Sequence, residues 1–391
     1  MAVMLQQILQ TSFAAYAEAH KVPRRVWRAA RAGMACRTAV LGGHVRQCPA
    51  RHITEVWYNS CRHRACPRCC TQRLNQWLDQ WQAQSLATDH FHVIFTLPSE
   101  LHALWRWNRQ ALTEVLFSSV RETLVTLLND PQWLGAQPGI LAALHTWGRT
   151  LVLHPHVHCL VSGGGLDTDG QWRAVRTGYL LPVAVVRSLF RGQVLGAIER
   201  LWLTGQLKEP PDFAEDGVRQ VLVAAARQQW NIRLAERSPH GRGVMKYLAR
   251  YVRGGPIKDQ RLVAFDGQQV TFHYGNHRDL DDAGQPRQAE LTLRVEEFLQ
   301  RWSEHVPLAG GHTVRAWGLY ASTQRRRLAE CREQLSEEAL PERPRGGREE
   351  PPRDRDHPWE HCPVCQQAMV IMQVLPPSGA PPRVESWAVA A

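Results

Sequence analysis

Leu151-Val-Leu-His-Pro-His-Val-His-Cys-Leu-Val161, which runs into Ser162-Gly-Gly-Gly165, is the stretch from which the fold can be predicted. Successive side chains of a β-strand point to opposite faces, so His154, His156 and His158 share one face of such a strand. The residues between them are apolar. The stretch therefore predicts a strand with one face packed on a core and a row of imidazoles on the other.

This row of imidazoles is a candidate metal site. Histidines two apart on a strand bring their ring nitrogens within reach of one ion, and imidazole is a common ligand of divalent metals. The alternative is a polar strand face turned to solvent, or a hydrogen-bonded histidine of the core. Three histidines in register on one face favour the metal site.

The length and charge of the chain indicate a protein of more than one domain with a polyanionic partner. The chain has 391 residues, enough for two or more domains, and a formal net charge of +11. The basic side chains are mostly arginines, whose guanidinium groups bind phosphate oxygens at two points and stack on bases, so we expect a nucleic-acid partner. No run of about 18 apolar residues and no secretory signal is found, and we expect no membrane partner.

The N-terminal residues 1–34 predict helices with one apolar face, followed by a basic run. Spacings of three and four residues are typical of a helix that packs on one side. The apolar positions are Leu5, Ile8, Leu9, Phe13 and Tyr16, and the basic run is Lys21, Arg24, Arg25, Arg28 and Arg31. We expect a basic arm that either packs on the protein or lies on phosphates.

Cysteines predict a structural zinc site. The chain has ten, six of which fall within residues 36–70, and cysteine pairs at spacing three are typical of zinc ligands. A second pair, Cys362-Pro-Val-Cys365, is half of a further possible zinc site whose other ligands stay open. The ligands predicted for the first site are Cys48, Cys66 and Cys69, with Cys61, His52 or His63 as the fourth.

A helix predicted after residue 243 carries a candidate nucleophile. Tyr247 and Tyr251 are four apart, so they lie one above the other on a helix, with Lys246, Arg250 and Arg253 beside them. Tyrosines at this spacing more often pack than react, but neighbouring cations favour the phenolate over the phenol, whose usual pKa is about 10. A phenolate beside a metal-bound phosphodiester is a competent nucleophile. No phosphate-binding glycine loop of the nucleotide-hydrolase kind is found, so we expect no nucleotide cofactor.

Taken together, these motifs resemble the rolling-circle transposases of bacterial insertion sequences, the HUH two-tyrosine class, over about residues 36–335. The matching segments are Cys36 to His44, Cys48, Ser60 to Cys69, Phe91 to Pro98, His156-Val-His158, a glycine-rich turn at Gly163 to Gly165, Tyr247 to Tyr251, and Arg315 to Tyr320. The chain departs from the family where Cys48-Pro-Ala-Arg51 replaces a Cys-x-x-Cys pair and where Ala65 replaces a histidine. These departures leave the fourth zinc ligand open.

The resemblance implies an α+β fold, in which an antiparallel-sheet HUH nuclease domain with helices packed on it follows a small zinc-binding module. The histidine strand is expected to be central, with the tyrosine helix lying across it. The expected division is a helical basic arm at 1–34, a zinc-binding DNA-binding module at 35–72, the HUH endonuclease domain with the tyrosine helix at 73–258, the C-terminal part of the transposase domain at 259–335, and a flexible linker and tail with the second Cys pair at 336–391.

The resemblance also implies chemistry. His156 and His158 are expected to hold Mg2+ or Mn2+, with His154 or His92 as third ligand, while Tyr247 or Tyr251 attacks single-stranded DNA. The products are a 5′-phosphotyrosine and a free 3′ hydroxyl. The remaining expected site residues are Lys246 beside the nucleophile, Arg250 and Arg253 on DNA, and Cys48, Cys61, Cys66 and Cys69 on zinc.

The expected function is that of a transposase which binds insertion-sequence ends and cleaves and rejoins DNA, in the bacterial cytoplasm and at the nucleoid when bound to DNA. The alternatives are a plasmid rolling-circle replication initiator or relaxase, a zinc-dependent DNA-binding protein without catalysis, and a hydrolytic zinc nuclease.

Overall fold

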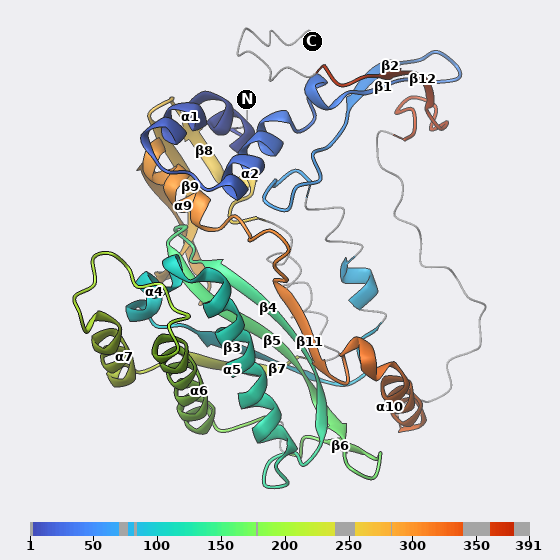
Figure 1. Cartoon of the computed structure of the whole chain (residues 1–391). Coiled ribbons are helices and arrows are strands. Elements are labelled where there is room, and N and C mark those ends of the chain that lie inside the picture. Colours follow the sequence, from blue (N-terminus) through green and yellow to red (C-terminus); the bar gives the residue numbers. More distant parts are fainter. Residues whose placement is uncertain are drawn as a thin grey trace. The chain divides into compact units, whose positions relative to one another are not determined.

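The computed structural model describes residues 3–69, 77–81, 84–176, 179–238, 255–282, 284–338 and 360–378, and it divides into two compact units (Figure 1). One unit consists of Met1–Thr71, Ile257–Gln300 and Pro341–Ala391, and the other of Gln72–Pro256 and Arg301–Leu340. Each unit is therefore built from separated stretches of the chain. The predicted helix with Lys246, Tyr247, Arg250, Tyr251 and Arg253 lies outside the described residues.

The second unit is built on an antiparallel sheet in the order β11-β4-β5-β3-β7, with β6 paired to β5. The histidine strand β5 is in the middle of this order, and the predicted α+β class with an antiparallel sheet is confirmed. The strands are β3 (His90–Thr96), β4 (Gln137–Trp147), β5 (Leu153–Leu166), β6 (Trp172–Ala174), β7 (Ile232–Ser238) and β11 (Val314–Gly318).

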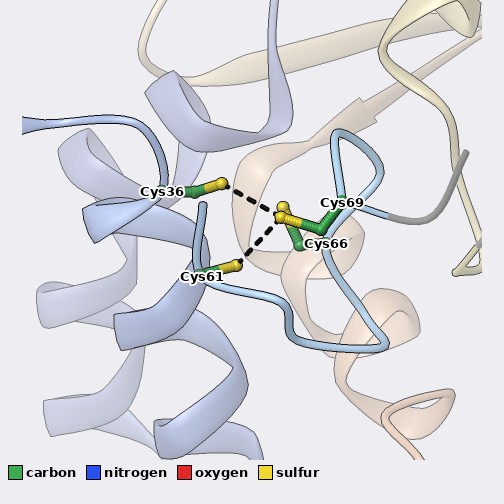
Figure 2. Close-up of side chains that lie close together, drawn as sticks. All are labelled: Cys36, Cys61, Cys66 and Cys69. Atoms are coloured by element: carbon green, nitrogen blue, oxygen red, sulfur yellow. Dashed lines mark hydrogen bonds between the residues drawn. The ribbon is translucent and has the colours of Figure 1, made fainter. Parts of the chain in front are cut away.

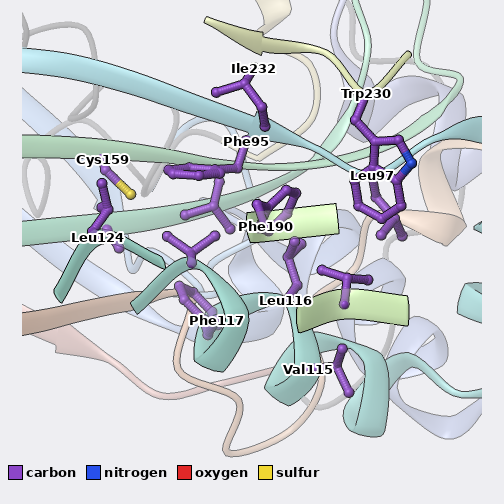
Figure 3. Close-up of a cluster of buried hydrophobic side chains, with 14 of the residues drawn as sticks. Phe95, Leu97, Val115, Leu116, Phe117, Leu124, Cys159, Phe190, Trp230 and Ile232 are labelled. Atoms are coloured by element: carbon purple, nitrogen blue, oxygen red, sulfur yellow. The ribbon is translucent and has the colours of Figure 1, made fainter. Parts of the chain in front are cut away.

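Helices cover the apolar face of this sheet, as Figure 1 shows for α5 and α6. Val157 and Cys159 of β5 are fully buried. The ring of Phe95 on β3 contacts the ring of Phe190 on α6, with centroids 4.9 Å apart and planes inclined at 59° (Figure 3). Burying each such side chain contributes about 1.5–3 kcal/mol, which fixes the register of the strand. The helices of this unit are α4 (His102–Trp107), α5 (Arg109–Asn129), α6 (Val183–Leu203), α7 (Gly217–Arg227) and α10 (Arg325–Glu338).

The opposite face of the sheet is divided between a second core and the histidines. Leu160 of β5 packs with Leu141, Tyr320 and Leu328 in that core. His156 and His158 lie on the same face, nearer the start of the strand, because they alternate with the buried Val157 and Cys159. One strand therefore carries the main core on one side and the histidines on the other.

The glycines after the histidine strand do not form the expected turn. Gly163, Gly164 and Gly165 belong to β5, which continues to Leu166. A Cβ atom on Gly164 would lie 2.5 Å from the indole of Trp172, and one on Gly165 would lie 2.4 Å from a backbone oxygen of β4. The glycines are thus explained by the close approach of neighbouring strands on both sides of β5.

The first unit contains α1 (Leu5–Ala19) and α2 (Arg24–Ala35), and the predicted apolar face of α1 is buried. Two small antiparallel sheets complete the unit, in the orders β10-β9-β8 and β12-β1-β2. Their strands are β8 (Leu262–Phe265), β9 (Gln269–Leu280), β10 (Pro286–Arg294), β1 (Gly43–Gln47), β2 (Thr54–Tyr58) and β12 (Val370–Leu375), and α9 (Val295–Glu304) follows β10. Within the described part of the chain, no helix has the length and apolarity needed to cross a bilayer.

Candidate functional site

Three histidines meet on the polar face of the central sheet. His156 and His158 of β5 are joined by His145 of β4, and each offers a ring nitrogen within 4.8 Å of those of the other two. His145 lies directly opposite His156 in the antiparallel pairing of the two strands. Directly opposite residues of paired strands point to the same side of the sheet, so the register brings three imidazoles to one point.

Burial keeps these imidazoles neutral. His145 and His158 are each 2% exposed, and desolvation followed by repulsion from neighbouring histidines holds both pKa values well below the usual value. Desolvation also lowers the pKa of His156 to about 4. At pH 7 all three rings are therefore in the neutral form, which is the form that ligates metals.

A hydrogen bond fixes the orientation of one ring. His156 donates from Nδ1 to the backbone oxygen of His154 at 2.6 Å, because a carbonyl oxygen can only accept. This tautomer leaves the lone pair on Nε2, the nitrogen that a metal would use. The donor set, three neutral imidazoles held by two paired strands, fits a divalent transition metal.

His92 supports the cluster from the neighbouring strand. Its Nε2 lies 2.8 Å from Nδ1 of His158, and their rings are stacked with centroids 5.0 Å apart. Desolvation, and then the positive charge of Arg233 on β7, lower the pKa of His92 to about 4. When His158 donates through Nδ1, its own Nε2 keeps a lone pair, and the hydrogen bond with His92 would orient that nitrogen toward a metal.

The structure thus brings together two of the predicted ligands, His156 and His158, and a third histidine, His145, that the sequence did not single out. His154 is not part of the group of three, although its ring centroid is 4.9 Å from that of His156. In the sequence, His145 is a single histidine in the apolar stretch before β5. Its place beside His156 follows from the register of β4 against β5, which cannot be predicted from spacing along the chain.

Four cysteines form a separate cluster in the first unit. Cys36, Cys61, Cys66 and Cys69 have sulfur atoms within 4.8 Å of one another, and their side chains converge (Figure 2). The Sγ atom of Cys69 lies 3.3 Å from that of Cys36 and 3.5 Å from that of Cys61. A tetrahedral zinc site with Zn–S bonds of about 2.3 Å has sulfur–sulfur edges of about 3.8 Å, so this donor set fits structural zinc.

Electrostatics in this cluster favour thiolate formation at two positions. Hydrogen bonds with Cys61 and Cys66 lower the pKa of Cys36 to about 7, against the opposing effects of a hydrogen bond with Cys69 and of burial. Hydrogen bonds with Cys36, Cys61 and Cys66 lower the pKa of Cys69 well below its usual value. Thiolate is the form that binds zinc.

The set of four differs from the predicted one. The expected ligands were Cys48, Cys61, Cys66 and Cys69, whereas Cys36 takes the place of Cys48 here. Cys48 follows directly on β1, and its sulfur lies beside His52 and the second Cys pair. Cys36 comes at the C-terminal end of α2, which carries it to the Cys66-Pro-Arg-Cys69 turn.

Replacing Cys36 by serine is expected to remove zinc from this cluster and to lower the melting temperature of the first unit by about 10 °C or more. The reason is that structural zinc contributes directly to folding, and each kcal/mol lost shifts the melting temperature of a unit of this size by roughly 2–4 °C. Elemental analysis and calorimetry measure both effects. The control is Cys331→Ser, which changes a buried cysteine of the other unit. This variant should keep the zinc of the four-cysteine cluster. Unchanged zinc in Cys36→Ser would contradict the assignment.

Comparison with known proteins gives two family matches. The family described as "Transposase zinc-binding domain" matches residues 8–97, and the family described as "Putative transposase" matches residues 139–327. The first match contains all four cysteines of the cluster, and the second contains the three histidines.

Two relatives are similar over most of the chain. "Putative transposase y4qJ" of Sinorhizobium fredii is 35% identical over 362 residues, which cover 89% of each chain. "Transposase for insertion sequence element IS801" of Pseudomonas savastanoi pv. phaseolicola is 33% identical over 303 residues, covering 74% of this chain and 68% of that one.

Among solved structures, "Conjugative Relaxase TrwC in complex with mutant OriT Dna" is similar over 40% of this chain and 71% of that chain. The sequence identity is 13% and the TM-score is 0.23.

Proposed function

We propose that this chain, which belongs to the family of insertion-sequence transposases that carry a zinc-binding domain, cleaves and rejoins single-stranded DNA at the ends of its element by tyrosine transesterification. The observation that carries the proposal is the cluster of His145, His156 and His158 on the central strands. Three converging neutral imidazoles, of which two are buried and that of His156 is partly exposed, fit a metal, whereas a polar strand face turned to solvent would not bring three rings together.

The three histidines would hold a divalent ion that polarises the scissile phosphodiester and disperses its developing charge. The protein supplies the rest of the site. His156 is oriented by its hydrogen bond to the backbone oxygen of His154, and His158 by its hydrogen bond with the ring of His92. Arg233 adds a positive charge beside His92. A guanidinium group in this place suits a phosphate oxygen of the bound strand.

The nucleophile in this proposal is the hydroxyl of Tyr247 or Tyr251. It attacks phosphorus, the tyrosine Oη–P bond forms, and the P–O3′ bond breaks. The phenol gives up one proton and the departing 3′ oxygen takes one up, so the step is balanced. Because the bond energy is retained in the phosphotyrosine, rejoining needs no nucleotide.

Chain geometry supports this role. β7 ends at Ser238, and Tyr247 comes nine residues later, a stretch that can span up to about 30 Å. Arg233 of β7 pairs with Ile94, which in turn pairs with His158, and about 17 Å of strand separates Arg233 from Ser238. The tyrosine segment is therefore within chain reach of the histidine cluster.

A buried tyrosine of the described residues does not suit the role. Tyr320 is 6% exposed, lies 2.6 Å from His90 Nε2 through its hydroxyl, and accepts a hydrogen bond from the backbone N–H of Leu86. Burial raises its pKa well above the usual value, which disfavours the phenolate. The cations that would favour a phenolate are instead next to Tyr247 and Tyr251 in the sequence, at Lys246, Arg250 and Arg253.

Manganese is expected to support cleavage at a concentration at least about tenfold lower than magnesium. Magnesium prefers oxygen ligands and retains its bound water, whereas imidazole nitrogen binds first-row transition metals such as manganese more tightly than it binds magnesium. Titration of protein purified without added magnesium or manganese, and with its structural zinc retained, measures the difference as cleaved DNA at each ion concentration. His145→Ala is expected to lose the preference. Equal half-maximal concentrations in the unmodified protein would mean that an oxygen-rich site elsewhere holds the ion.

The function is tested with two labelled single-stranded oligonucleotides, one with an element end and one with a target sequence. We expect the end to be cut and its strand joined to the target, giving a longer labelled product, while a scrambled end gives neither product. Binding of the end without any cleavage would instead identify a DNA-binding protein without catalysis. A replication initiator or relaxase is not favoured, because both relatives are transposases. The place of action we propose is the bacterial cytoplasm, at the nucleoid.

A further inference from the structure

A third group of metal-binding side chains joins the two ends of the chain. Cys48 and His52 come from the N-terminal part, and Cys362 and Cys365 come from the C-terminal part. Cys48 Sγ lies 3.5 Å from Cys365 Sγ and 3.6 Å from His52 Nδ1, while Cys362 Sγ lies 3.8 Å from the same nitrogen. All four ligand atoms lie within 4.8 Å of one another.

These distances are those of a tetrahedral zinc site. Zn–S bonds of about 2.3 Å and a Zn–N bond of about 2.0–2.1 Å give sulfur–sulfur edges of about 3.8 Å and sulfur–nitrogen edges of about 3.6 Å. The cysteines Cys48, Cys362 and Cys365 are not in disulfides. Three thiolates and one imidazole fill all four positions, which is the donor set of a structural zinc site and leaves no open position for a substrate.

The backbone presents the ligands on two tight turns. In the first turn Arg51 donates its N–H to the oxygen of Cys48 at 2.7 Å, and Arg51 has a φ of 60°. In the second turn Gln366 donates to the oxygen of Cys362 at 2.8 Å, also with a φ of 60°. Left-handed residues other than glycine are uncommon, and their presence in both turns indicates that something holds the turns in place.

The surrounding sheet also needs such a support. β12 pairs with β1 from Gly43↔Leu375 to Gln47↔Val370, and β1 pairs with β2. Val370, Met372 and Val374 are 49%, 61% and 66% exposed, so this sheet buries little apolar surface. Small sheets without a core are marginal in water, and small domains of this kind are commonly held by a metal. Cys48, by contrast, is fully buried at the end of β1.

From the cluster, the turns and the exposed sheet, we propose that Cys48, His52, Cys362 and Cys365 form a second structural zinc site that fastens residues 360–378 to the N-terminal hairpin of β1 and β2. The site needs ligands from both ends of the chain. The family match for the zinc-binding domain covers residues 8–97, so of these four ligands it includes only Cys48 and His52. This inference does not depend on the proposed function.

Zinc content of the purified full chain tests the proposal. Compared with the unmodified protein, Cys362→Ser/Cys365→Ser is expected to hold about one zinc ion fewer, and Cys61→Ser/Cys66→Ser also about one fewer. The comparison is independent of any zinc that the three histidines bind, because both variants keep those histidines. The control Cys331→Ser should hold as much zinc as the unmodified protein. Equal zinc content in Cys362→Ser/Cys365→Ser and the unmodified protein would overturn the proposal.

A second measurement covers the case in which these variants do not fold. A protease site is inserted between Gly346 and Gly347, and the purified protein is cut there. We expect the C-terminal piece to copurify with the remainder until a strong zinc chelator is added, and to separate afterwards. Separation of the piece without chelator, with zinc content unchanged, would contradict a site shared between the two ends.

Discussion

Replacing Tyr247 and Tyr251 together by phenylalanine is expected to abolish attachment of DNA to the protein and to reduce single-strand cleavage by about 10⁴-fold or more. Removal of a catalytic nucleophile has effects of this size, because no remaining group can form the covalent intermediate. The change deletes two hydroxyl groups and keeps both aromatic rings, so the size and shape of each side chain are almost unchanged. Denaturing gels with labelled element-end DNA measure the attached fraction.

The single variants show whether the two tyrosines have separate tasks. If each cuts one strand, Tyr247→Phe and Tyr251→Phe should each allow one cleavage and block the joined product. Tyr179→Phe is the matched control, because Tyr179 is 53% exposed and lies outside the histidine cluster. Attachment of DNA to the double variant at the level of the unmodified protein would contradict both assignments.

Replacing His145 by alanine is expected to lower metal-dependent cleavage at least about 100-fold. Loss of a group that only orients a metal ligand costs about 10- to 100-fold in metal affinity or activity, and loss of a ligand should cost at least as much. His156→Ala and His158→Ala are expected to behave alike, because the three rings form one cluster. His92→Ala should have a smaller effect, within about 10- to 100-fold, since His92 contacts the cluster through His158.

His154→Ala is the control for this series, because it removes a histidine of the same strand that is not in the group of three. We expect cleavage within about threefold of the unmodified protein, since the backbone oxygen that orients His156 is retained. Manganese titration separates metal binding from simple destabilisation: in His145→Ala, raising the manganese concentration should restore part of the activity. Loss of activity in His154→Ala together with full activity in His145→Ala would reverse the assignment of the third ligand.

The sequence predicted the central element correctly because its signal is local. Alternation of His156 and His158 with Val157 and Cys159 follows from the geometry of a strand, and burial of the apolar residues then fixes which face the histidines occupy. The apolar face of α1 was predicted for the same reason, by spacing along one helix.

Ligands that meet only through pairing of distant segments could not be predicted in this way. His145 reaches His156 through the register of two strands, and that register depends on the packing of the whole sheet. Cys36 and Cys48 are both close in sequence to the Cys66 to Cys69 turn, and only the path of α2 and β1 separates them into two clusters. Cys362 and Cys365 could not be assigned from the sequence either, because they are far in sequence from their partners Cys48 and His52.

The most direct test of the account is to identify the residue that becomes linked to DNA. The unmodified protein is incubated with an element-end oligonucleotide and Mn2+, digested with nuclease and trypsin, and analysed by tandem mass spectrometry. We predict a nucleotide on Tyr247 or Tyr251, absent after chelation of the metal and absent in His158→Ala. Cleaved DNA with a free 5′ phosphate and no nucleotide-bearing tyrosine would show hydrolysis instead, and would contradict tyrosine transesterification.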